Sequence, residues 1–401
     1  MQNTSKNFCI MPHSHMEISS RGFSLPCCAY KSDLLELPIP LPNVANTSLK
    51  NIFENHILWN SARNLSRNDK FNPACRQCHM EENSGLESYR LSSNKRFGSY
   101  IDVEKEDRKL LSLELKLGAK CNLACRTCNS KFSNKLLKED SILILGHLDK
   151  DWMRNMQKQS EWSSSEVFWN QMHDISKDLV YIKFTGGEPL IIDEHFKYLE
   201  WLVENKLDPE ISYITNGTIQ LTDRIKNIWS KFSKVTVTVS IDATEDLEEY
   251  IRTGCVWEEQ NKNINDYVDL LGTDNVEILS TISVLNVHKI KSLIDIFSPR
   301  INLGFNILSY PEFLDIRNLN SNAKEYLNSV YNNIINTNVT LSDDILNGIR
   351  LIQNSFNRTP IKLIDIAEEI RKKDAAHNLV NKKAQHNYEK LETDWFKIIE
   401  G

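Results

Sequence analysis

Nine cysteines are the residues of this sequence best suited to chemistry, and all but Cys255 fall into three groups. The groups are Cys9, Cys27 and Cys28; Cys75 and Cys78; and Cys121, Cys125 and Cys128. Closely spaced thiolates are the ligands of zinc ions and iron–sulfur clusters. An odd number of cysteines without a secretory signal argues against a disulfide framework. The grouping therefore predicts metal binding, and Cys255 is expected to be a buried, small apolar residue.

The third group follows the pattern Cys-x3-Cys-x2-Cys, directly after an apolar run at 111–117. A closed 4Fe–4S cluster takes four cysteine ligands, so three thiolates would leave one iron open. Catalytic metal sites keep an open position of this kind. For these three cysteines taken alone, a zinc knuckle or three buried thiols are the alternatives.

Short runs rich in valine, isoleucine and threonine alternate with amphipathic stretches after residue 110. This pattern is typical of parallel strands joined by helices. Strands are expected at 111–117, 180–185, 211–215, 235–241, 276–284 and 301–308, and helices at 195–204, 223–232, 264–271 and 289–297. Six such units predict an α/β fold, a partial (β/α)6 TIM-like barrel with its site at the C-terminal ends of the strands.

Three domains are expected around this pattern. Residues 1–110 predict a small irregular module with a helix near 49–65, and residues 111–320 predict the partial barrel. Residues 321–401 predict a helical C-terminal extension. Three tryptophans in the long connection 129–178 are expected to cover the outside of the barrel.

Polar motifs follow three of the expected strands. They are Gly186-Gly187-Glu188-Pro189, Thr215-Asn216-Gly217 and Ser240-Ile241-Asp242, with Arg252 further along the chain. Paired glycines let a backbone approach a ligand closely. The amide, hydroxyl and carboxylate groups can form hydrogen bonds with a ligand, and Arg252 can pair with a carboxylate. A surface ion pair is the alternative for Arg252.

These motifs, in this order, resemble the radical S-adenosylmethionine (radical SAM) superfamily over about residues 111–310, although Ala243 stands where glycine is common. The resemblance implies a 4Fe–4S cluster on Cys121, Cys125 and Cys128, with S-adenosylmethionine on its open iron. It implies cofactor-binding roles for Gly186, Gly187, Glu188, Pro189, Thr215, Asn216, Ser240, Asp242 and Arg252. In that family, an electron from the cluster cleaves the cofactor to methionine and a 5′-deoxyadenosyl radical, which abstracts hydrogen from the substrate.

The N-terminal cysteines look like the auxiliary-cluster module called twitch, which is related to the longer SPASM module. The resemblance implies a second 4Fe–4S cluster on Cys9, Cys27, Cys75 and Cys78, with Cys28 as the substitute for Cys27. The nearby Glu81, Gly85, Ser88 and Arg90 fit the stretch that trails the module's last cysteines. In relatives the module usually follows the barrel, whereas here it precedes it. A structural zinc site is the alternative, and His13, His15 and His79 are expected to lie on the surface.

The resemblance implies an oxidoreductase-type enzyme that abstracts hydrogen from a peptide or a small metabolite. The net result would be an oxidation or a natural-product modification assisted by the auxiliary cluster, with flavodoxin or ferredoxin as electron donor. A net charge of −6 gives no reason to expect nucleic acid as a partner. The sequence shows no membrane span and no signal peptide, so a cytoplasmic location is expected. The alternative is a non-catalytic cluster- or zinc-containing binding protein on a degenerate barrel.

Overall fold

The computed structural model describes residues 6–35, 39–83, 87–100, 108–337, 341–358, 364–381 and 385–400. The chain forms two compact units. The first comprises 1–118, 158–213 and 227–235, and the second comprises 119–157, 214–226 and 236–401. The domains predicted at 1–110, 111–320 and 321–401 are defined by sequence motifs and not by compactness, and they stay a prediction.

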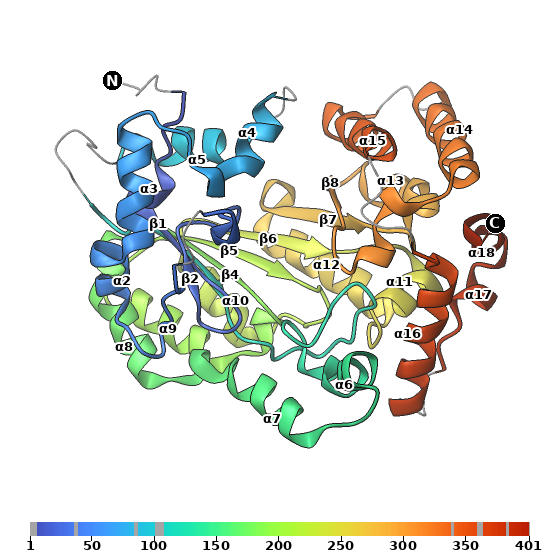
Figure 1. Ribbon diagram of the computed structural model, residues 1–401. Coiled ribbons are helices and arrows are strands. Elements are labelled where there is room, and N and C mark those ends of the chain that lie inside the picture. Colours follow the sequence, from blue (N-terminus) through green and yellow to red (C-terminus); the bar gives the residue numbers. More distant parts are fainter. Residues whose placement is uncertain are drawn as a thin grey trace. The chain divides into compact units, whose positions relative to one another are not determined.

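The first unit contains a sheet with the strand order β2-β1-β3-β4-β5, in which β1 and β2 are antiparallel and the other pairs are parallel (Figure 1). The strands are β1 (His15–Ile18), β2 (Ser24–Leu25), β3 (Ser112–Lys116), β4 (Tyr181–Thr185) and β5 (Glu210–Thr215), the last two residues of which belong to the second unit. The helices are α1 (Met11–Ser14), α2 (Leu49–Asn55), α3 (Ile57–Arg67), α4 (Arg76–Asn83), α5 (Tyr89–Phe97), α8 (Glu166–Ile175) and α9 (Asp193–Glu204). Along β4, Ile182 and Phe184 are fully buried, while Tyr181, Lys183 and Thr185 are partly exposed. One face of this strand therefore forms part of the core.

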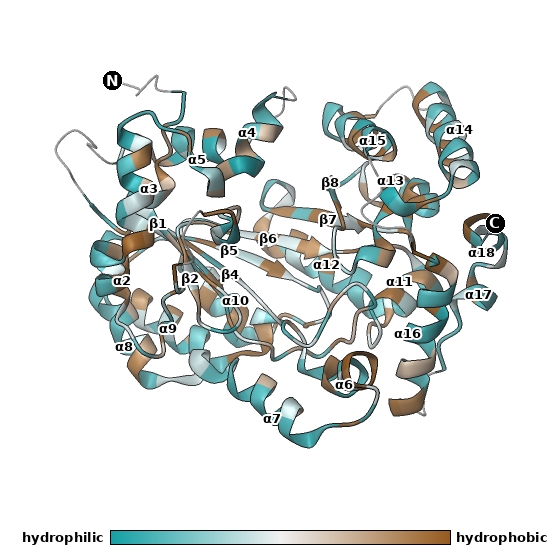
Figure 2. Cartoon of the chain, viewed as in Figure 1, coloured by the Kyte–Doolittle hydropathy of each residue, from teal (hydrophilic) through white to brown (hydrophobic). Residues whose placement is uncertain are grey.

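The second unit contains the parallel strands β6 (Val235–Ser240), β7 (Val276–Ile282) and β8 (Asn302–Ile307) in that order, except that the first residue of β6 belongs to the first unit. Its helices are α6 (Leu137–Leu145), α7 (Lys150–Lys158), α11 (Glu245–Ile251), α12 (Trp257–Leu271), α13 (Ile290–Phe297), α14 (Ser321–Thr337), α15 (Asp343–Phe356), α16 (Ile366–Val380), α17 (Tyr388–Leu391) and α18 (Thr393–Glu400), while α10 (Asp223–Trp229) crosses the unit boundary. The valines of β6 alternate with less buried threonine and serine, and Figure 2 shows the corresponding hydrophobic positions on the strands.

The predicted α/β class is confirmed, because β3 to β8 occupy the six predicted strand positions and helices separate them in the chain. Strands β1 and β2 were not expected, since residues 1–110 were predicted to be irregular. β1 pairs in parallel with β3, with His15 opposite Ser112 and Glu17 opposite Glu114. Polar residues in a four-residue strand hide the alternation by which strands are recognised.

The predicted helix at 49–65 is divided in two. Ser48 caps α2 by accepting a hydrogen bond from the Asn51 N–H group. His56 has extended backbone angles and separates α2 from α3, whose start it caps with its own side chain. Within the part of the chain that the structure describes, no helix combines the length and apolar character needed to cross a membrane.

Tryptophans anchor segments of both units by hydrogen bonds. In the first unit, Trp162 and Trp169 are buried, and their indole N–H groups donate to the carbonyls of Ser20 and Ser163. In the second unit, Trp395 of α18 donates to the Val284 carbonyl at 2.9 Å. The last helix therefore docks on the loop after β7 through its few apolar residues.

Candidate metal centres

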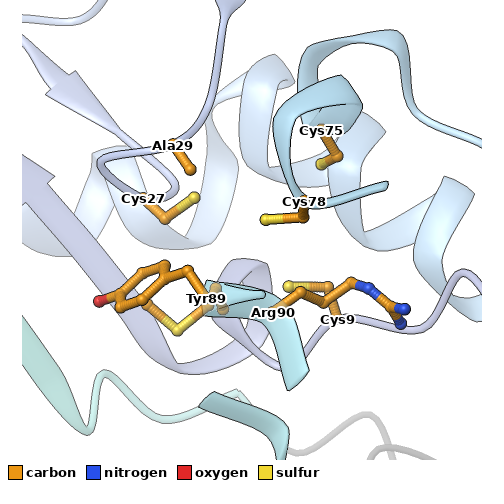
Figure 3. A pocket seen from close by; sticks show the side chains of 8 residues that line it. Cys9, Cys27, Ala29, Cys75, Cys78, Tyr89 and Arg90 are labelled. Atoms are coloured by element: carbon orange, nitrogen blue, oxygen red, sulfur yellow. The ribbon is translucent and has the colours of Figure 1, made fainter. Parts of the chain in front are cut away.

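Four of the N-terminal cysteines line one pocket of the first unit. Cys9 precedes α1, Cys27 follows β2, Cys75 ends a 3-10 turn and Cys78 lies in α4. Figure 3 shows Cys27 and Cys78 pointing toward each other across this pocket, which also contains Tyr89 and Arg90. The tertiary structure thus brings together thiols from three separate segments of the chain.

Backbone hydrogen bonds hold these segments in place. The Cys9 N–H group donates to the Ser66 hydroxyl at 2.9 Å, and that hydroxyl donates back to the Cys9 carbonyl at 3.1 Å. The Lys31 N–H group donates to the Ala74 carbonyl, which ties the chain beyond Cys27 to the turn that ends at Cys75. The pocket is therefore braced by contacts that do not involve the thiols themselves.

The electrostatics of the pocket disfavour thiolates in the absence of a cation. Burial, followed by the neighbouring Cys78, raises the pKa of Cys75 to about 12. Burial and Cys75 likewise raise the pKa of Cys9. Arg90, which donates to the Phe8 carbonyl and pairs with Glu82 at 2.5 Å, places a positive charge nearby. Cationic iron or zinc would supply the charge that four buried thiolates require.

The structure separates Cys27 from Cys28. Cys27 is buried and lines the pocket, whereas Cys28 is exposed and does not line it. Of the trailing residues, Ser88 and Arg90 both contact Glu82, while Gly85 lies outside the described residues. Within the described ranges, no three histidine, cysteine or acidic side chains are grouped as ligands of a metal ion.

The prediction of surface histidines is wrong for His13 and His15, which are 0% and 1% exposed. Neither lines the cysteine pocket. His15 lies in β1, where its Nδ1 atom is 2.7 Å from the Ser112 hydroxyl, and burial lowers its pKa to about 3. His15 belongs to the core because β1 is an interior strand of the sheet, and His13 is buried in the short helix α1 that precedes this strand.

The central cysteine loop lies wholly in the second unit. All three side chains are partly exposed, and Cys128 and Cys121 both raise the pKa of Cys125 after the larger effect of burial. Burial also raises the pKa of Cys128 to about 11. The three thiols are therefore near enough to interact electrostatically. The loop contains no fourth cysteine.

Two main-chain hydrogen bonds fasten the central loop to the end of α11 and to the segment that follows it. Ala124 donates to the Thr253 carbonyl at 2.9 Å, and Arg126 donates to the Ile251 carbonyl at 2.7 Å. Gly254 has a φ of +99°, and a β-carbon there would approach Leu123 to 3.3 Å. A glycine is needed at this position because its backbone has a positive φ and passes close to the loop.

Several of the predicted cofactor-binding residues surround this loop. Asn216 donates to the Asn122 side chain at 2.9 Å, and its amide nitrogen lies 4.0 Å from the Cys121 sulfur. The hydroxyl of the preceding residue, Thr215, accepts a hydrogen bond from the Gly217 N–H group at 3.3 Å. Ser240, which is partly exposed, ends β6. The end of β5 thus provides polar groups beside the first cysteine.

Arg252 is buried, so the surface ion pair that was the alternative for it is wrong. Its guanidinium lies 2.9 Å from the Asp242 carboxylate and 3.4 Å from Glu248, both fully buried. Burial raises the pKa of Glu248 to about 7, against the opposing effect of Arg252. Asp242 also accepts the Thr281 N–H group, so its carboxylate is engaged with the protein itself.

The Gly186–Pro189 loop is part of the first unit. Gly186 has a φ of +121°, and a β-carbon there would come within 2.6 Å of the Leu117 nitrogen. The close approach that this glycine permits is therefore to the chain's own backbone at the end of β3. Glu188 is fully buried, and its side chain accepts the Leu190 N–H group at 3.0 Å.

A buried ionic network connects the central loop to α16. Arg126 donates to Glu139 at 3.0 Å and to Asp374 at 3.1 Å, and His377 lies 3.0 Å from Glu139. Lys373 of the same helix lies 3.5 Å from the Cys128 carbonyl. The sequence did not predict this network, although Arg126 stands inside the cysteine motif, because Lys373, Asp374 and His377 lie far along the chain.

Comparison with known proteins identifies the N-terminal segment. Residues 9–79 match the family model of the SPASM iron-sulfur cluster-binding domain, which confirms the predicted resemblance of this segment. No curated protein matches the chain.

Solved structures with a similar arrangement include anSMEcpe with bound AdoMet, at 18% identity and a TM-score of 0.37; the match covers 58% of this chain and 63% of anSMEcpe. Streptococcus suis SuiB is 15% identical with a TM-score of 0.36, over 83% of this chain and 69% of SuiB. SuiB bound to S-adenosylmethionine is 14% identical with a TM-score of 0.35, over 74% of this chain and 67% of SuiB. This chain therefore spans less than two thirds of anSMEcpe.

Proposed function

We propose that this protein is a radical SAM enzyme that abstracts hydrogen from a peptide or a small metabolite. The observation that carries the proposal is the presence of two separate cysteine sets, each gathered within its own unit. One set stands on a single loop beside the end of β5, and the other lines a pocket within residues matching an iron-sulfur domain. One cluster with an iron free of protein ligands and one with all four irons bound by cysteine suit an enzyme that binds a cofactor at the first cluster and transfers electrons through the second.

The central loop has the donor set for an open 4Fe–4S cluster. Cys121, Cys125 and Cys128 would bind three irons and leave the fourth for S-adenosylmethionine. When bound and reduced, the cluster would supply the electron that splits S-adenosylmethionine into methionine and a 5′-deoxyadenosyl radical, which takes a hydrogen atom from the substrate. The Asn216 amide is placed to orient groups beside Cys121.

The polar residues near the loop would hold the cofactor. Asn216, Thr215 and Ser240 stand at strand ends and offer amide and hydroxyl groups for the ribose. Arg252 keeps a positive charge near Cys125, although Asp242 and Glu248 share it. The Gly186–Pro189 loop would bind the amino group of the cofactor, as the resemblance implies.

The N-terminal pocket would hold an auxiliary 4Fe–4S cluster on Cys9, Cys27, Cys75 and Cys78. The match of residues 9–79 to an iron-sulfur domain favours this cluster over a zinc ion. Four thiolates would leave no iron open, so this cluster would transfer electrons and take no part in cofactor binding. Accepting an electron from the substrate radical would make the net reaction an oxidation.

Counting iron and sulfide in the anaerobically reconstituted protein tests the proposal. We expect about eight irons per wild-type chain and about four in Cys121→Ala/Cys125→Ala/Cys128→Ala. Reduction with dithionite in the presence of S-adenosylmethionine is expected to produce 5′-deoxyadenosine in the wild type alone. About four irons together with zinc in the wild type would mean that the N-terminal pocket holds a structural zinc ion and not an auxiliary cluster. Two clusters without 5′-deoxyadenosine would instead identify a non-catalytic binding protein.

A further inference from the structure

An exposed segment of unusual composition follows the central cysteines in the second unit. It runs from Lys131 to Leu148 and is named here the α6 face. Its exposed residues are Lys131, Phe132, Lys135, Lys138, Leu143, Ile144, Leu145, Gly146, His147 and Leu148. Ile144 is 64% exposed and Leu148 is 52% exposed. Figure 2 shows hydrophobic positions on α6. Adjacent exposed apolar side chains of this kind mark interaction sites in water-soluble proteins.

The lysines of the α6 face carry charge that the protein does not neutralise locally. Among the described residues, none of the three lysines has an ion-pair partner within 4.0 Å. The acidic residues on α6 are turned inward, since Glu139 pairs with Arg126 and Asp140 accepts the Ser130 N–H group at 2.6 Å. The face is therefore basic, although the net charge of the chain is −6.

The α6 face is fastened directly to the central cysteine loop. The Ser133 hydroxyl donates to the Leu123 carbonyl at 2.6 Å, and the Asn134 N–H group donates to the Ala119 carbonyl at 2.7 Å. The Asn134 side chain also accepts a weak hydrogen bond from the Cys121 N–H group, at 3.4 Å. A protein docked on this face would stand close to any cluster bound by the loop, as electron transfer requires.

We propose that the α6 face binds a small acidic electron-transfer protein that reduces the cluster on Cys121, Cys125 and Cys128. The proposal rests on the proposed function, because only an enzyme of that kind needs one electron delivered to this loop. The donor loses one electron and the cluster gains it, and no covalent bond changes. Exposed lysines on the same segment as exposed apolar side chains suit a transient complex, since charge speeds the encounter and apolar contact holds it briefly.

Charge reversal tests this proposal. The variant is Lys131→Glu/Lys135→Glu/Lys138→Glu, and its matched control is Lys226→Glu/Lys262→Glu/Lys397→Glu, which reverses three exposed lysines elsewhere in the same unit. The measured quantity is the rate at which reduced flavodoxin bleaches the central cluster, taken as the part of the visible absorbance change that Cys121→Ala/Cys125→Ala/Cys128→Ala lacks, with dithionite as the small reductant for comparison. We expect the variant to be reduced by flavodoxin at least about tenfold more slowly at low salt. The difference is expected to shrink at high salt.

Ile144→Ser/Leu148→Ser is expected to slow reduction by flavodoxin at every salt concentration, because apolar contact is not screened. Equal slowing in the control variant, or no slowing in either variant, would overturn the docking proposal. Slowing with dithionite as well would show damage to the cluster site and would also overturn it. Failure of wild-type protein to form 5′-deoxyadenosine with dithionite would instead count against the proposed function, because cluster bleaching is measured without turnover.

Discussion

The two cysteine sets of this protein differ in how the chain assembles them. The central set lies within one short loop whose thiols are partly exposed, whereas the N-terminal set comes from separate segments and lines a largely buried pocket. A loop of neighbouring ligands can bind metal with little help from the fold. A pocket built from distant segments also joins those segments, so metal binding there contributes to folding stability. The comparison suggests a chemical role for the central set and a mainly electron-transfer and structural role for the N-terminal set.

The largest expected effect separates these roles. We expect Cys75→Ala/Cys78→Ala to make residues 6–100 sensitive to limited proteolysis, because two of the ligands that join α4 to the rest of the pocket are gone. Cys121→Ala/Cys125→Ala/Cys128→Ala is expected to keep the wild-type proteolysis pattern and to lose all 5′-deoxyadenosine formation. Equal protease sensitivity in the two variants would remove the distinction between the sets.

The next effect concerns the support behind the central loop. Arg126→Met leaves Glu139 and Asp374 buried without their shared cation, and the loss of one partner of a buried ion pair costs about 3–5 kcal/mol. Urea unfolding is expected to show this loss in the free energy of unfolding. The control is Arg154→Met, which removes an exposed ion pair with Asp151 and is expected to cost less than about 1 kcal/mol. A small loss in Arg126→Met would show that the network does not support the loop.

A smaller effect concerns the core around β1. Burial lowers the pKa of His15 from 6.5 to about 3, so in acid the unfolded chain takes up a proton that the folded chain refuses. Stability is therefore lost as pH falls below about 6.5, by about 1.4 kcal/mol per pH unit for this one histidine. His15→Asn is expected to reduce the slope of unfolding free energy against pH by that amount between pH 6 and 4.5. An unchanged slope would contradict the prediction, and exposed His147→Asn serves as the control.

The smallest effect would sharpen the assignment of the central set. The buried Lys373 ammonium near Cys128 is expected to favour the reduced cluster, which carries one more negative charge. Lys373→Met should therefore lower the midpoint potential of the central cluster in a titration followed by electron paramagnetic resonance. Lys372→Met, which removes an exposed lysine from the same helix, is expected to leave the potential unchanged. A potential unchanged by Lys373→Met would show that α16 has only a packing role.

The sequence determined the features that depend on neighbouring residues. The strands β3 to β8 appear at the positions predicted from short apolar runs, most of which are rich in β-branched residues, because local propensity and burial agree there. The central cysteines stand on one loop because only seven positions separate Cys121 from Cys128. The likeness of residues 9–79 to an iron-sulfur domain was also predictable, because the cysteines of this segment are closely spaced in the sequence.

Only the tertiary structure decided which groups meet over long distances. It placed Cys27 in the pocket and left Cys28 outside it, a choice that adjacent identical residues cannot reveal. It buried His15 in β1 and connected Lys373 to the central loop across more than 200 residues of sequence. Such pairings have no local signal, because they depend on strand register and helix packing, which are properties of the folded chain as a whole.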